Sequence, residues 1–129
     1  MKYSYADDVK KVAESIINVL GLEYIDISRL GFVRSRGSRS RQVIARIHAI
    51  GRAWEVGFNI RPMYLIEVIS ERFDRLPQQE KERVIIHELL HIPKGLSGGF
   101  VPHRRGVNQR KVEEMHIKYR AEERILFRC

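Results

Sequence analysis

Cysteine is almost absent from this sequence. The only cysteine among the 129 residues is Cys129, so no disulfide can form within the chain and no zinc site built from several cysteines is available. A metal ion bound by this chain would therefore need ligands from histidine, aspartate or glutamate.

Long apolar runs are also missing. No run approaches the roughly 20 apolar residues that a transmembrane helix needs, and the first residues, MKYSYADD, lack the apolar core of a signal peptide. We therefore expect a cytoplasmic protein that does not associate with membranes.

The sequence has no excess of acidic residues. Lysine and arginine number 24 against 16 aspartates and glutamates, which gives a formal charge of +8 and permits attraction to nucleic-acid phosphates. The segment RSRGSRSR contains the candidate nucleic-acid contacts Arg34, Arg36, Arg39 and Arg41. A solvated charged surface explains the same residues, and we favour it.

The apolar pattern predicts one α+β domain over residues 1–129, since 43% hydrophobic residues suffice for a core. Apolar residues recur at intervals of three and four residues between Tyr5 and Leu20, which predicts a helix that ends at Gly21. Segments rich in β-branched and aromatic residues follow. They predict a small, mostly antiparallel sheet of three to four strands from EYIDISRLGFV, QVIARIHAI, RAWEVGFNI and YLIEVIS.

Two further helices are expected after the strands. Pro77 suits the start of a helix that runs through HELLH to about His91, and Asn108 suits the N-cap of another that ends near Phe127. Prolines and glycines between them predict a loop. RSRGSRSR, with no apolar residue, is expected to be a solvated hairpin loop.

The HELLH segment carries the clearest chemistry. His87 and His91 are four residues apart and so lie on one helix face, where both imidazoles can reach one ion, while Glu88 points beside it. Zinc held in this way lowers the pKa of a bound water, and a neighbouring carboxylate can take the water's proton. We expect one Zn²⁺ per chain with Glu88 as the catalytic general base.

Catalytic zinc usually has a third protein ligand. We favour His103, because the glycine-rich segment IPKGLSGGFVP is pliant enough to fold back and deliver it to the metal. The alternatives are Glu113, Glu114 and His116 on the last helix. The two glutamates also fit a solvated face, and His116 fits a supporting or core position.

The sequence from Tyr64 onward resembles small metallopeptidases of archaea and phages. The most specific elements of this resemblance are HELLHIP, the GG that follows it, and His103 in PHRRG. The resemblance implies a zincin-like fold, peptidase activity, and metal ligands at His87, His91 and His103. A more distant resemblance is to SprT-like proteases, some of which cleave DNA-crosslinked proteins. The chain lacks their cysteine-rich zinc module, and the residues around His103 differ.

Proteases of this architecture resemble one another in binding a peptide along an exposed strand edge. RAWEVGFNI (Arg52–Ile60) and QVIARIHAI (Gln42–Ile50) are the candidate edges, although core packing explains Trp54 and Phe58 better. A donor to the oxyanion is also expected. Its candidates, which could instead support the metal site, are Tyr64, Arg104, His116 and Tyr119.

Two other classes of function remain open. One is a nucleic-acid-binding protein with a structural zinc, although such a site closes with four ligands and has no use for Glu88. The other is a degenerate zincin that binds a protein or peptide without cleaving it. The intact HELLH motif argues against this class.

Overall fold

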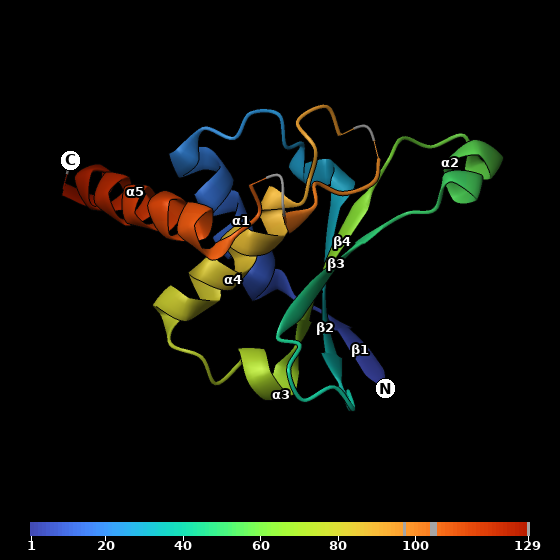
Figure 1. Cartoon of the computed structure of the whole chain (residues 1–129), viewed down its shortest axis with the longest axis horizontal. Helices are drawn as coiled ribbons and strands as arrows, with labels where there is room; N and C mark the ends of the chain where they lie inside the picture. Colours follow the sequence, from blue (N-terminus) through green and yellow to red (C-terminus); the bar gives the residue numbers. More distant parts are fainter. Residues whose placement is uncertain (97, 104–105, 129) are drawn as a thin grey trace.

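A four-stranded mixed sheet organises the protein (Figure 1). The computed structural model describes residues 1–96, 98–103 and 106–128. The strands β1 (Lys2–Tyr5), β2 (Leu30–Arg36), β3 (Ala45–Ala49) and β4 (Tyr64–Ile69) stand in the order β1-β2-β4-β3. The β1–β2 and β3–β4 pairs are antiparallel and the β2–β4 pair is parallel. The predicted α+β class is confirmed, and β3 is an edge strand.

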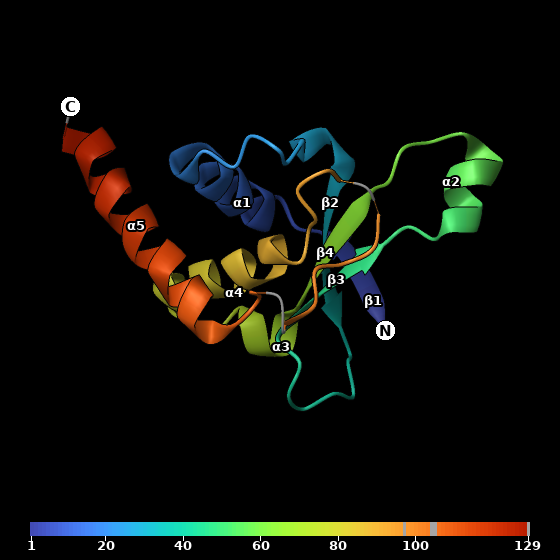
Figure 2. The ribbon, with the colours of Figure 1, turned by 45° about the horizontal axis from the view of Figure 1, so that its top comes forward.

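The helices α1 (Asp7–Leu20), α4 (Gln78–Leu90) and α5 (Gln109–Arg128) gather beside the sheet (Figures 1 and 2). The core forms where α1 and α4 meet the central strands, and Ile16, Phe32, Ile66 and Ile86 are at most 1% exposed there. Helix α1 ends as predicted at Gly21, whose φ of 64° is left-handed. The 3-10 helix Ile27–Arg29 and α3 (Ser70–Phe73) were not predicted.

Helix α4 positions the HELLH segment. Pro77 occupies its N-cap, and the buried side chains of Ile85, Ile86 and Leu89 join the core, while His91 is the C-cap. At the start of α5, the Asn108 side chain accepts a hydrogen bond from the Lys111 N–H at 2.9 Å. The predicted bounds of both helices are confirmed to within a few residues.

The segment RAWEVGFNI is not a strand. Residues Arg52–Phe58 form α2, which begins after Gly51 and ends at Asn59 in a left-handed conformation with φ 52°. The helix links β3 to β4 and projects away from the other helices (Figure 2). Core packing of Trp54 and Phe58 was also a wrong expectation. The two rings are 59% and 66% exposed and stack on each other with centroids 5.4 Å apart.

The segment RSRGSRSR is not a hairpin loop. Strand β2 continues through Arg36, and β4 lies between β2 and β3, so the segment joins two strands that are not neighbours. The alternation of β2 places Arg34 on the face that carries Phe32. There its guanidinium donates hydrogen bonds to the carboxylates of Asp8 and Asp74.

The remaining arginines of this segment, Arg36, Arg39 and Arg41, are exposed to solvent. Within the described ranges, no helix combines the length and the apolar character that crossing a bilayer requires.

Candidate metal centre

Three histidines meet at the end of α4. His87 and His91 come from successive turns of the helix, with ring centroids 5.1 Å apart, and His103 comes from the loop between α4 and α5. The His103 ring lies 5.2 Å from that of His87 and 4.7 Å from that of His91. One ligand nitrogen from each of the three lies within 4.8 Å of the others.

The spacing of these nitrogens fits a tetrahedral metal ion. The Nε2 atoms of His87 and His103 are 3.2 Å apart. Two ligands of one zinc ion, each at about 2.0–2.1 Å from it, stand roughly 3.3 Å apart in tetrahedral geometry. The nitrogen-only donor set also suits zinc, and three protein ligands leave a fourth position for water or substrate.

A backbone contact fixes the orientation of His91. Its Nδ1 atom lies 2.7 Å from the carbonyl oxygen of Val101. A carbonyl oxygen can only accept, so Nδ1 carries the proton and Nε2 keeps its lone pair for a metal. The Val101 N–H in turn donates to the His91 carbonyl at 2.8 Å. The helix end and the histidine-bearing loop are therefore joined by a reciprocal pair of hydrogen bonds.

Tyr64 and Arg29 hold the first part of the same loop. The Tyr64 hydroxyl accepts from the Gly98 N–H and donates to the Gly99 carbonyl, both at 3.1 Å. Both glycines have left-handed φ angles, 92° and 72°, which side chains disfavour. Arg29 donates to the Leu96 carbonyl at 2.8 Å. These contacts close the loop in the form that brings His103 to α4.

Glu88 lies beside the histidines in a buried position. Its side chain is 7% exposed and accepts no hydrogen bond from the residues that the structure describes. Burial raises the pKa of Glu88 to about 7. A carboxylate with this pKa is well matched to proton transfer near neutral pH. Burial and the neighbouring His91 and His103 also lower the pKa of His87, which favours the neutral, ligating imidazole.

An open cavity of about 460 Å³ adjoins this group. Its walls come from three elements: the segment Gln42–Ala45 at the start of edge strand β3, the α4 residues Val84, His87 and Glu88, and the first turns of α5. The cavity therefore connects the segment that leads into edge strand β3 with His87 and Glu88.

The other candidates for the third ligand are engaged elsewhere. Glu113 accepts from Arg83 Nε at 2.9 Å, and Glu114 lies 3.5 Å from Arg110 Nε. Neither belongs to the group of potential ligands that contains His103. His116 is buried between α4 and α5, where its Nε2 lies 2.9 Å from a Glu82 carboxylate oxygen.

The candidate oxyanion donors also have other partners in this structure. The Tyr119 hydroxyl lies 2.7 Å from Ser15 Oγ on α1, His116 faces Glu82, and Tyr64 binds the loop. Arg104 lies outside the described residues.

Two contacts that shape the site have no signal in the sequence. They are the contact of His91 with the Val101 carbonyl and the hydrogen bond from Arg29 to the Leu96 carbonyl. Every residue has a backbone carbonyl, so the sequence does not indicate which one is used.

Comparison with known families gives an independent result. A family model described as "putative phage metallopeptidase" matches residues 1–127. No curated protein and no solved structure matches the chain.

Proposed function

Because the chain belongs to the putative phage metallopeptidase family, we propose that it is a zinc-dependent peptidase in which Glu88 acts as general base. The observation that carries this proposal is the meeting of His87, His91 and His103, with a buried carboxylate at Glu88. A structural zinc site would need a fourth protein ligand, and the described residues offer three in this group.

The chain's own residues have separate tasks in this proposal. His87, His91 and His103 hold the zinc ion through neutral imidazole nitrogens. Once bound, the ion supplies a Lewis acid for the scissile carbonyl and lowers the pKa of a water molecule. Glu88 takes the proton of that water as it attacks and then gives it to the departing amine.

The edge of β3 is the proposed platform for the substrate. Within the described chain this strand pairs with β4 alone, so its outer N–H and C=O groups can bond a peptide in extended form. The residues before β3 line the cavity that holds Glu88. Of the two candidate edges, Gln42–Ile50 is therefore retained, since Arg52–Phe58 is helical.

Metal analysis and a cleavage assay test this function. Protein purified without added metal should contain about one zinc per chain and cleave casein or a peptide library. A chelator should abolish cleavage, and added zinc should restore it. Full activity in the metal-free protein would contradict the proposal.

A second candidate function is association with nucleic acid. Arg36, Arg39 and Arg41 are exposed immediately before the cavity wall at Gln42, so bound nucleic acid would lie close to the proposed active site. The contacts would be to phosphates, so the affinity should fall steeply with salt. Replacing the three arginines with glutamine should remove it, and binding that is indifferent to salt would exclude this mode.

A further inference from the structure

A second cavity lies beside the N-terminal part of α5. It has a volume of about 460 Å³ and is walled by Tyr24, by the end of α4 and the loop after it, and by α5. The proposed active-site cavity uses Gln109, Val112 and Glu113 of α5, whereas this one uses Arg110, Lys111 and Glu114. Among the residues that the structure describes, the two cavities share no lining residue, so the second is a separate site.

The second cavity continues into a neighbouring one of about 600 Å³. Both are lined by Tyr24, Leu90, Lys94 and Lys111, so they form one groove. The volume of each cavity falls within the range of small-molecule sites, about 300–1,000 Å³. Apolar side chains from α1, α4 and the following loop make up much of its wall, among them Leu20, Leu22, Leu90, Ile92 and Val107.

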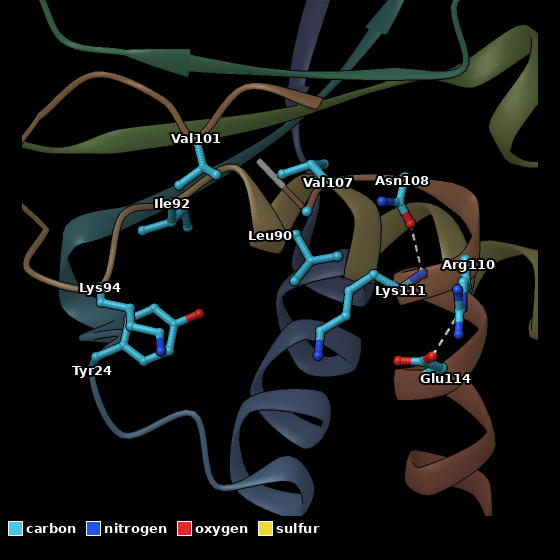
Figure 3. A pocket seen from close by; sticks show the side chains of 11 residues that line it. Tyr24, Leu90, Ile92, Lys94, Val101, Val107, Asn108, Arg110, Lys111 and Glu114 are labelled. Atoms are coloured by element: carbon cyan, nitrogen blue, oxygen red, sulfur yellow. Dashed lines mark hydrogen bonds and ion pairs between the residues drawn. The ribbon is translucent and has the colours of Figure 1, made fainter. Parts of the chain in front are cut away.

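Positive charge dominates the rim of this groove. Lys94, Lys111 and Lys118 are exposed, and none has a carboxylate within ion-pair distance in the described part of the chain. Glu114 also faces the groove, but it is paired with Arg110 at 3.5 Å (Figure 3). The charged side chains of the groove therefore carry a net positive charge with no internal partner for the lysines.

Tyr24 adds a neutral donor beside the lysines. Figure 3 shows Tyr24 and Lys94 on one side of the cavity and Lys111 on the other, with Leu90 between them and Ile92, Val101 and Val107 beyond. The Tyr24 hydroxyl has no hydrogen-bond partner among the described residues. Burial raises its pKa, so it keeps its proton and can donate.

We propose that this groove binds an organic anion that consists of a carboxylate on an apolar chain. The carboxylate would lie between Lys94 and Lys111 and accept a hydrogen bond from Tyr24, because charge-assisted bonds favour an ionised acceptor. The chain would lie against Leu20, Leu22 and Leu90, which are half-buried and line the groove, where apolar contact is favourable and a second charge would lose its hydration. This site is independent of the proposed peptidase activity.

Two kinds of molecule share this chemistry: a fatty acid, and a peptide with an apolar C-terminal residue. Calorimetric titration of the zinc-loaded protein with decanoate and with acetyl-Leu-Leu distinguishes them. Decanol and the peptide amide serve as controls that keep the apolar part and lack the charge. We expect one or both acids to bind at one site per chain and both controls to bind at least fivefold more weakly.

Variants locate the binding site. The double variant Lys94→Gln/Lys111→Gln should weaken binding of the acid by about fivefold or more, since two charge interactions are lost. Tyr24→Phe keeps the ring and should weaken it by about two- to tenfold. Lys2→Gln on β1 removes the same charge outside the groove and should leave the affinity unchanged. Thermal melts and zinc content verify that all variants are folded.

Three results would overturn the proposal. One is the absence of binding by either acid at about 1 mM, the affinity of a very weak site. Another is equal affinity for an acid that binds and its uncharged control, decanol for decanoate or the peptide amide for acetyl-Leu-Leu. The third is parental affinity in both the double variant and Tyr24→Phe.

Discussion

His91 and Val101 are joined by two hydrogen bonds, from His91 Nδ1 to the Val101 carbonyl at 2.7 Å and from the Val101 N–H to the His91 carbonyl at 2.8 Å. The first orients an imidazole, and the second ties the end of α4 to the loop two residues before His103. One short backbone segment therefore links two of the three candidate ligands, and these contacts hold the end of α4 against the loop that carries His103.

Removal of His103 should sharply reduce metal affinity. Two histidines cannot hold zinc against water and chelators as three can, so His103→Ala should lose its zinc during dialysis against a weak chelator. Glu113→Ala and Glu114→Ala are the matched controls, because both carboxylates are paired with arginines of the helices. Metal analysis after dialysis measures how much zinc each variant retains. Zinc retained by His103→Ala but lost by either control would assign the third ligand elsewhere.

Tyr64→Phe should weaken zinc binding without touching a ligand. The variant loses both hydrogen bonds to Gly98 and Gly99, at a cost of about 1–2 kcal/mol in the free energy of unfolding, and loosens the loop that carries His103. Tyr119→Phe loses a bond to Ser15 on the far side of the core and should keep parental zinc affinity. Competition with a fluorescent zinc chelator measures the difference. Equal affinities in the two variants would show that the Tyr64 contacts do not position the site.

Much of this arrangement could be predicted from sequence, because its signals are local. The helical spacing of the apolar residues Val9, Ala13 and Ile16 predicts α1. Pro77 and Asn108 predict the starts of α4 and α5. His87 and His91 are four residues apart, so a helix is enough to place them on one face as a candidate pair of ligands. The glycines before His103 allow the chain to fold back, which predicts His103 as the third ligand, and the structure brings it to that pair.

The errors arose where long-range pairing decides the structure. Trp54, Val56 and Phe58 favour strands by propensity, but no strand lies beside them, and the turn from β3 to β4 is made by a helix instead. RSRGSRSR has the composition of a hairpin loop, yet the strand beside β2 is β4, which comes later in the sequence. Strand β1 consists of four exposed residues, and within the described chain it pairs with β2 alone, so no local apolar pattern predicts it.

Substitutions on α2 should leave the stability nearly unchanged. Trp54→Ala removes an exposed side chain whose described ring contact is with Phe58, so the free energy of unfolding should fall by at most about 1 kcal/mol. Phe73→Ala removes a ring that is 1% exposed and should cost about 3–5 kcal/mol. Urea unfolding compares the two. A cost for Trp54→Ala as large as that for Phe73→Ala would place α2 in the core.

The Arg34 cluster should make stability sensitive to acid. Hydrogen bonds from Arg34 lower the pKa of Asp8. Burial alone would raise the pKa of Asp74, but hydrogen bonds from Arg34 and Ser70 outweigh it and lower that pKa as well. Both carboxylates therefore stabilise the fold above their unfolded pKa values, and this contribution is lost as the pH falls below about 4.

Replacement of Arg34 with glutamine should flatten that dependence. Urea unfolding of Arg34→Gln between about pH 2.5 and 7 should show lower stability at neutral pH and a shallower loss towards acid than in the parent. Arg36→Gln removes an exposed arginine of the same strand and should retain the parental profile. Identical acid profiles for the parent and Arg34→Gln would mean that the pKa values of Asp8 and Asp74 do not depend on Arg34.

The rate of peptide cleavage by Glu88→Gln, measured on protein of known zinc content, tests the proposed mechanism most directly. The amide has nearly the shape of the carboxylate and is not needed as a ligand, so the fold and the zinc should be retained. It cannot accept a proton at neutral pH, so the cleavage rate should fall by about 10²–10⁴. Cleavage at the parental rate by zinc-loaded Glu88→Gln would contradict the assignment of Glu88 as general base, and loss of the zinc would make it a structural part of the metal site.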